Sequence, residues 1–287
     1  MAPNTAKQKK KKPIWLKKML GNKKFCIGGV LLLIIVFMAI FAPYLTKYDY
    51  SAMKVGKLCE RPSAAHILGT DNFGRDVFTR VVYGARISLL VSLTCMLLSV
   101  LIGTTIGLIS GFVGGLFDVI IMRLSDLLTS IPSVLLAVTV SSFIGEGLQV
   151  VIAAITASFL PGAIRLARSL VLSIREREYV QAAIVIGEKK STILFRYILP
   201  NCVAPIIVQT TGRLASAVLG EAAISYLGYG TQPPTPSWGL MLSDSQGLMW
   251  KAPYLCIIPG VAIIILVLAA NLFGDGLRDL LDPKYRG

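Results

Sequence analysis

The amino-acid sequence predicts an all-α integral membrane protein with about six transmembrane helices, and three observations lead to that fold class. The 287-residue chain is 54% hydrophobic with a mean hydropathy of +0.70, and only 15% of its residues are charged. A typical soluble domain has about 25% charged residues, so this chain carries more apolar surface than a soluble core can bury. Nearly uncharged segments of about 20 residues, the length that crosses about 30 Å of hydrocarbon, recur along it.

Six such segments define the expected spans. In order they cover residues 25–45, 87–109, 130–144, 148–164, 202–227 and 253–273. The third is too short alone and must include part of the stretch after Phe117, which carries Asp118, Arg123 and Asp126. On a helix these three residues could share one broad face that is turned away from lipid. An even number of spans places both ends of the chain on one side of the membrane.

The distribution of positive charge orients these spans. The net charge is +14, and a large share of it comes from lysines before or at the start of the first span, namely Lys7, Lys9, Lys10, Lys11, Lys12, Lys17, Lys18, Lys23 and Lys24. The positive-inside rule predicts that this run is cytoplasmic, and the basic segment 165–201 must then be cytoplasmic as well. The loop between the first two spans is also basic, although it is expected outside.

A nucleic-acid-binding arm is the alternative interpretation of the lysine run. It is disfavoured because no folded basic domain with interleaved aromatic residues accompanies the run, so no nucleic-acid partner is expected. The chain then divides into a basic cytoplasmic segment (1–24), a first helix with an outer loop (25–86), a five-helix core (87–274) and a cytoplasmic tail (275–287). The core includes the cytoplasmic loop 165–201.

Two packing features were open to more than one interpretation. Gly103, Gly107 and Gly111 recur every fourth residue in the second span, a pattern that lets another helix approach closely in lipid. That second helix belongs either to this chain or to a partner subunit. The proline-rich loop 228–239 predicts a structural turn or a rigid rim around a pore mouth, and its Trp238 suits the membrane interface.

Catalytic and metal-binding patterns are not found in the sequence. It lacks the G-x-x-x-x-G-K-[ST] phosphate loop, so this chain is not expected to bind ATP by that device. His66 is the single histidine, which excludes multi-histidine metal sites, and it is expected to be a hydrogen-bonding or capping residue. We therefore expect no catalytic residue, no metal site and no cofactor on this chain.

Two ionisable residues fall inside the fifth span. Glu221 follows Arg213 by eight residues, or about 12 Å along a helix, so the two are not expected to pair. An ionisable group at that depth is costly in lipid, which makes both residues candidates for the solute path. The alternative is a polar residue that is hydrogen bonded within the bundle.

The cytoplasmic segment carries a longer motif. Residues 178–187 read E-Y-V-Q-A-A-I-V-I-G and residues 195–201 read F-R-Y-I-L-P-N. This pattern resembles the E-A-A-x-x-x-G-x(9)-I-x-L-P loop of binding-protein-dependent ABC importer permeases, where it forms the helices that dock on the ATPase subunits. Gln181 replaces the usual Glu, and Tyr197 stands where Ile or His is common. The resemblance assigns coupling to Tyr179, Gln181, Ala182, Ala183, Gly187, Leu199 and Pro200.

Further stretches resemble the second, C-type permease of the dipeptide, oligopeptide and nickel importers. They are L-G-T-D-N-F-G-R-D-V at 68–77, S-Y-L-G at 225–228, Q-P-P-T-P-S-W-G at 232–239, and N-L-F-G-D-G-L-R-D at 271–279 followed by Asp282 and Pro283. The resemblance implies a type I ABC importer permease fold in the cell membrane of a prokaryote, with both termini in the cytoplasm.

The resemblance also implies function and partners. A homologous second permease, two ABC ATPase subunits that use ATP and Mg, and an extracytoplasmic solute-binding protein would assemble with this chain. The cargo would be di- or oligopeptides, with glutathione, nickel or a metal chelate as alternatives. An ion-driven secondary transporter is the rival from another class, and it should show internal repeats and ionisable groups near the midplane. Only Arg213 and Glu221 come close, and no repeat is evident.

Overall fold

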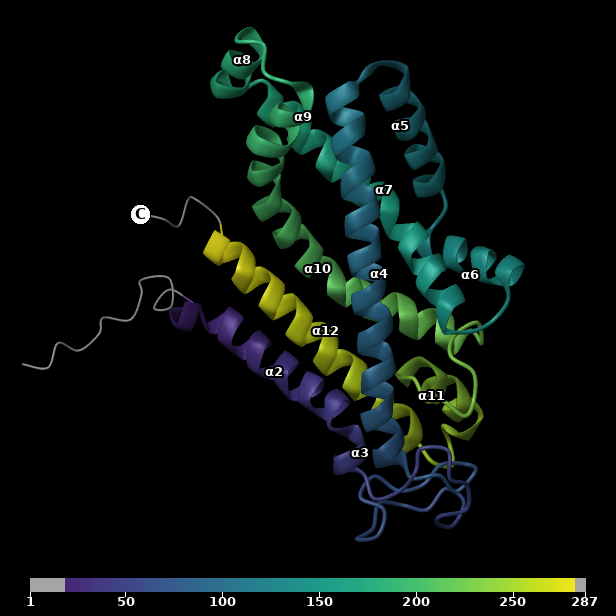
Figure 1. Ribbon diagram of the computed structural model, residues 1–287. Helices are drawn as coiled ribbons and strands as arrows, with labels where there is room; N and C mark the ends of the chain where they lie inside the picture. The colour runs from purple at the N-terminus through teal and green to yellow at the C-terminus, as the bar shows by residue number, and fades with distance from the viewer. Residues whose placement is uncertain (1–18, 282–287) are drawn as a thin grey trace, which may run out of the picture.

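The computed structural model describes residues 19–281, and these form a helical bundle (Figure 1). The long apolar helices are α2 (Lys23–Ile40), α4 (Val77–Val113), α7 (Leu148–Arg175), α10 (Leu199–Tyr226) and α12 (Tyr254–Leu281). Each of these five is long and apolar enough to cross a membrane, and α10 is continuous with the residues from Lys190. Between residues 19 and 281 no β-strand forms, so the predicted all-α class is confirmed.

The third predicted span is a broken one. It consists of α5 (Gly115–Ser130) and α6 (Ser133–Ile144), which pass the test for a span together but are bent by 95°. Pro132 causes the break, because the residue before a proline is pushed into extended backbone and Ile131 has φ −95° and ψ 128°. The bundle therefore has five spans, or six if this bent pair counts as one.

Short helices complete the described chain. They are α3 (Ala42–Leu45), α8 (Glu178–Val185), α9 (Lys190–Thr192), the π-helix η1 (Ile193–Ile198), α11 (Trp238–Ser245) and the 3-10 helix η2 (Gln246–Leu248). In Figure 1, α8 and α9 lie at the opposite end of the bundle from the irregular loop that joins α3 to α4.

Two spans are longer than hydropathy predicted, because charged residues in them have partners. Helix α4 begins at Val77 instead of residue 87, with Asp76 as its N-cap accepting a hydrogen bond from the Thr79 N–H at 2.8 Å. Helix α7 continues to Arg175, so Arg165 and Arg168 lie on a helix and not in a loop. The bundle tolerates their charge because each pairs with a carboxylate of α5.

The charged residues of α5 differ in their partners. Arg168 donates two hydrogen bonds of 2.6 Å to the Asp118 carboxylate, and Arg165 lies 3.8 Å from Asp126. Arg123 is exposed and forms no ion pair between residues 19 and 281, and Asp126 is also exposed. The two acids attach α5 to α7, and the orientation of Arg123 away from lipid stays a prediction.

The glycine stripe packs within the subunit. A Cβ atom on Gly103 would lie 2.5 Å from the Ala163 Cβ, and one on Gly107 would collide with the Ile164 carbonyl oxygen. Both neighbours belong to α7, so the glycines let α4 and α7 approach by backbone contact. Of the two interpretations of the stripe, packing inside this chain is the one that the structure supports.

Trp238 is part of the core, so its predicted position at the membrane interface is wrong. Its side chain is 3% exposed, its Nε1–H donates to the Val81 carbonyl at 3.0 Å, and its ring contacts the site of Gly84. The hydrogen bond satisfies the indole donor, which allows a large aromatic ring to be buried. It thereby attaches α11 to the first turns of α4.

The two ends of the described chain lie side by side. The Phe25 and Phe273 rings pack with centroids 5.0 Å apart, and Lys24 Nζ lies 3.8 Å from the Asp279 carboxylate. These contacts place the start of α2 and the end of α12 at the same end of the bundle. The lysines at 7–18 and the Asp282–Pro283 pair lie outside the described residues.

Candidate functional site

The segment predicted to couple to an ATPase, residues 178–201, forms a compact helical unit at one end of the bundle and is called the coupling unit below. Val180 and Ala183 of α8 are buried against Ala167 and Val171 of α7 and against Ile198 of η1. Gly187 ends α8 with φ +81°, and the Glu188 N–H donates to the Ala183 carbonyl at 3.1 Å. This is the Schellman arrangement that reverses the chain after a helix.

The surface of this unit exposes large apolar side chains among charged ones such as Lys189 and Lys190. Val185 is 84% exposed, Ile186 is 74% exposed, and Tyr179 and Phe195 are exposed beside them. Contiguous exposed apolar side chains on a protein surface mark a site for a partner. The predicted coupling residues are thus brought together in one unit, but they do not all face outward.

The individual coupling residues have different surroundings. Ala182 is exposed, whereas Ala183 packs against its own chain. Gln181 is exposed, and its Nε2 donates to the Arg175 carbonyl at 2.8 Å, which links α8 back to the end of α7. Pro200 lies in the first turn of α10, where the missing N–H costs nothing, and Leu199 is half-buried.

Glu221 is a polar residue of the bundle interior. It is 1% exposed, and its carboxylate accepts hydrogen bonds from Ser88 at 2.9 Å and Ser225 at 2.8 Å. Ser88 belongs to α4, so the carboxylate joins α4 to α10. A buried carboxylate is tolerated only when such donors satisfy it. Of the two alternatives for Glu221, the structure supports the packing role.

Arg213 lies at the contact between α7 and α10. Its Nη1–H donates to the Phe159 carbonyl at 3.3 Å, and its guanidinium occupies the space beside Gly162. It is half-buried, and no ion pair with Glu221 occurs between residues 19 and 281. Arg213 and Glu221, the two candidates for the solute path, therefore form separate contacts: Arg213 with α7, and Glu221 with α4.

A groove that the sequence did not predict lies between α6, α7 and α10. Its volume is about 340 Å³, and its lining is mostly apolar, with Ser133, Ser158 and Ser216 as the polar residues among the side chains that line it. No residue that lines it is charged. Serines on three separate spans are a weak sequence signal, because serine is common in transmembrane helices where it bonds back to the preceding turn. Ser158 does so to the Ala154 carbonyl at 2.9 Å.

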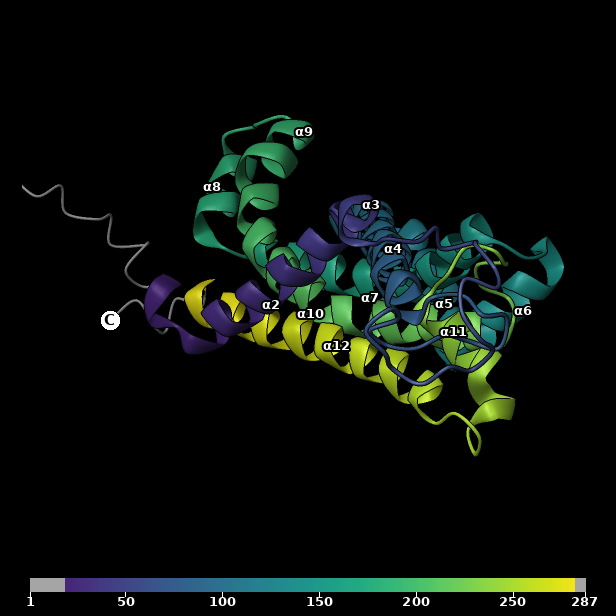
Figure 2. The same ribbon diagram turned by 90° about the horizontal axis from the view of Figure 1, so that it is seen from below.

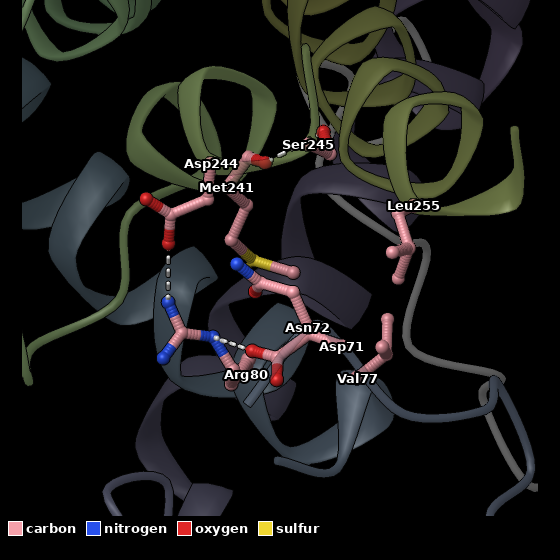
Figure 3. A pocket seen from close by; sticks show the side chains of 8 residues that line it. All are labelled: Asp71, Asn72, Val77, Arg80, Met241, Asp244, Ser245 and Leu255. Carbon is pink, nitrogen blue, oxygen red and sulfur yellow. Dashed lines mark hydrogen bonds and ion pairs between the residues drawn. The ribbon is translucent and has the colours of Figure 1, made fainter. Parts of the chain in front are cut away.

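A cluster of ion pairs fixes the opposite end of the bundle, and Figure 3 shows the contacts of Arg80 with Asp71 and Asp244. Arg75 Nε lies 2.6 Å from the Asp71 carboxylate, and Arg80 contacts Asp71 at 3.7 Å and Asp244 at 3.6 Å. Burial raises the pKa of the Asp244 carboxyl above its ordinary value, and the guanidinium groups of Arg80 and Arg75 oppose that rise. The cluster attaches the loop before α4 to α11.

His66 is a hydrogen-bonding residue, as predicted. Its Nδ1 lies 2.9 Å from Asp76, the carboxylate that caps α4, and the imidazole is buried. Among the described residues, no three His, Cys, Asp or Glu side chains lie close enough to hold a metal ion. The His66–Asp76 contact secures the loop at the start of α4.

Comparison with known proteins identifies the family. Residues 103–287 match the family described as binding-protein-dependent transport system inner membrane component, and residues 14–60 match the N-terminal transmembrane domain of oligopeptide transport permease C. The dipeptide transport system permease protein DppC of Alkalihalophilus pseudofirmus is 44% identical over 270 residues, which cover 94% of this chain and 89% of that protein.

Two further similarities extend this result. The glutathione transport system permease protein GsiD of Salmonella paratyphi A is 42% identical, over 91% of this chain and 86% of that protein. The inward-facing MetNI methionine ABC transporter shares the fold at a TM-score of 0.59 and 19% identity, over 70% of this chain and 96% of that one. The chain therefore belongs to the binding-protein-dependent inner membrane component family, whose members are multi-pass membrane permease subunits of ABC importers and not enzymes.

Proposed function

We propose that this chain is one of two homologous permease subunits that together import di- or oligopeptides. The observation that carries the proposal is the match over 94% of the chain to a dipeptide permease. The uncharged groove supports it, because its mostly apolar wall suits varied peptide side chains, while Ser133, Ser158 and Ser216 can exchange hydrogen bonds with a peptide backbone.

Two ATPase subunits that use ATP and Mg dock on the coupling unit in this proposal. The exposed side chains of Tyr179, Val185, Ile186 and Phe195 supply the apolar contact. This chain contributes no ATP-binding loop, so its work is mechanical: it alternates between access from one side of the membrane and access from the other.

The coupling unit and both termini face the cytoplasm, while the loops 46–76 and 228–251 face out. The basic run before α2 and the arginines at the end of α7 support this orientation. The separation of the coupling unit from the α3–α4 loop along the bundle is consistent with it (Figure 1). An extracytoplasmic solute-binding protein delivers cargo to the outer loops.

Glutathione is the second candidate cargo, since a glutathione permease is 42% identical to this chain. Nickel or a metal chelate is the other alternative that the sequence motifs allow. A transporter driven by an ion gradient is the rival mechanism, and transport measurements distinguish it from ATP-driven import.

The test is uptake by the complete complex in proteoliposomes, with the receptor outside and ATP inside. Labelled dipeptide, labelled glutathione and Ni²⁺ are offered separately, each with a matched sample that lacks ATP. We expect uptake of the dipeptide that requires both ATP and receptor. If only glutathione or only Ni²⁺ is taken up, that solute is the cargo and the peptide assignment is wrong. Uptake driven by an imposed proton or sodium gradient without ATP would overturn the mechanism.

A further inference from the structure

The outer loop between α3 and α4 exposes cations that have no counterion within the described chain. Lys47, Lys54, Lys57 and Arg61 are exposed, and none of them forms an ion pair with another residue between 19 and 281. The positive-inside rule disfavours such residues in a short outer loop. Their presence there needs a reason other than membrane orientation.

The acids of the same loop are already engaged. Asp71 is buried against Arg75 and Arg80, and Asp76 is buried against His66 and caps α4. The two remaining acids are also bonded locally: Asp49 accepts from the Ser51 N–H at 2.7 Å, and Glu60 accepts from the Lys57 N–H at 3.2 Å. The folded loop therefore buries two of its four acids, while Asp49 is exposed and Glu60 is half-buried, so the four exposed cations outnumber the acids that solvent reaches.

Apolar side chains are interspersed with these cations. Leu58 is 64% exposed, and Met53 and Phe73 are exposed near Lys54 and Lys57. Lys54 and Phe73 are neighbours in space, because the Lys54 N–H donates to the Phe73 carbonyl at 3.0 Å, and Met53, Lys57 and Leu58 follow or precede Lys54 within four residues. A surface that mixes large apolar side chains with cations has the composition of a protein interface.

The loop lies across the end of the bundle and not along its side. Seen from that end, it covers the start of α4 and reaches α11, to which the Arg75–Asp244 contact of 3.3 Å attaches it (Figure 2). The same loop extends past the ends of α4 and α12 in the view of Figure 1. Its exposed face is thus directed away from the lipid that surrounds the bundle.

We propose that Lys54, Lys57 and Arg61, together with Met53, Leu58 and Phe73, form a docking surface for an acidic face of the solute-binding protein. This surface is called the outer basic patch below, and the inference rests on the proposed function. The cations steer the receptor by long-range attraction, whereas the apolar side chains hold the docked complex.

The test measures receptor binding to the complete transporter in nanodiscs of neutral lipid, with the purified solute-binding protein of the same transport system as the probe. The triple variant K54E/K57E/R61E reverses the charge of the patch. Its control is K251E, which reverses an exposed cation on the same outer side of the bundle but outside the patch and outside the coupling unit. We expect the association rate constant of the triple variant to fall about tenfold or more, and its dependence on salt between about 50 and about 300 mM to be lost.

A second variant tests the apolar part. M53S/L58S keeps every charge, so it should increase the dissociation rate while the association rate remains near that of wild type. Because all five side chains are exposed, the variants retain the fold, and wild-type basal ATPase activity in each preparation verifies this.

The outcomes separate the two proposals. If the triple variant binds receptor with the wild-type rate and salt dependence, the patch is not the docking surface, although the import function stands. If its defect appears only in nanodiscs with anionic lipid, the patch serves the membrane surface and the receptor assignment is overturned. If the wild-type complex itself binds no receptor, the proposed function and this inference both fail.

Discussion

Replacement of Gly187 by valine tests the coupling role with one backbone change. Gly187 ends α8 with φ +81°, and the hydrogen bonds from Gly187 N–H to Ile184 and from Glu188 N–H to Ala183, each 3.1 Å long, depend on that conformation. A side chain at this position would meet no atom within 4 Å. The substitution therefore acts through backbone conformation and not through a steric clash with a neighbour.

The expected cost follows from the positive φ. A β-branched residue held in the left-handed region costs about 1–3 kcal/mol, whereas asparagine tolerates that region well. The cost reduces the population of the native turn between about fivefold and about 150-fold, since about 1.4 kcal/mol corresponds to a factor of ten. G187V should misplace the docking face, and G187N should retain it.

The assay compares reconstituted complexes of equal subunit content and measures solute uptake and ATPase rate together. The matched control is G247V, since Gly247 also lies in a tight helical turn with open space around it, but without a positive φ. We expect G187V to insert normally and to lose most uptake and most stimulation of ATP hydrolysis by the loaded receptor. G187N and G247V should behave like wild type. Unchanged uptake per ATP in G187V, or an equal loss in G187N, would refute the coupling role of this turn.

Three further predictions follow from the sequence and the structure. The purified chain alone should hydrolyse no ATP, because it lacks a phosphate loop, and robust activity in a clean preparation would contradict this. With the five native cysteines replaced by alanine, a membrane-impermeant thiol reagent added outside should label a cysteine at Thr235 and not one at Lys189, and the reverse result would invert the topology. Glu221→Ala should lower the free energy of unfolding by about 1–3 kcal/mol, because it removes the hydrogen-bond acceptor of Ser88 and Ser225. Glu221→Gln keeps an acceptor oxygen, so it should lower the free energy of unfolding by less. Thermal unfolding in detergent measures both variants, and an unchanged stability of Glu221→Ala would contradict the packing role.

The spans could be predicted from hydropathy, but their limits could not. An arginine lowers the mean hydropathy of a segment, so the predicted spans end before it. Arg80 and Arg168 nevertheless lie on helices, where carboxylates distant in sequence pair with them. Asp118 lies 50 residues from Arg168, and Asp244 lies 164 residues from Arg80, so neither pairing is visible before the chain folds. The partner of the glycine stripe was undetermined for the same reason.

The candidate site was predicted unevenly. The motif gave the position of the coupling unit, and its glycine has the positive φ that a turn after α8 requires. Motif spacing does not report which side chains face outward, so the burial of Ala183 and the return of Gln181 to Arg175 were not anticipated. Glu221 drew attention because a carboxylate is costly in lipid, but the donor that satisfies it is Ser88, 133 residues away.

The coupling unit lies between the two helices that carry most of the groove. Ser158 precedes the end of α7 at Arg175 by 17 residues, and Ser216 follows the start of α10 at Leu199 by 17 residues, so each groove wall is about 26 Å from the unit along its helix. The buried contacts of Val180 and Ala183 join both helix ends to α8. A rigid tilt of about 10° at the unit would therefore move both walls in the same direction by about 4–5 Å, which is close to the one-turn shift of about 5.4 Å between elements of some switching proteins. Because the α7 and α10 walls share one pivot, we infer that a stroke on α8 displaces these two walls together and leaves the distance between them nearly constant.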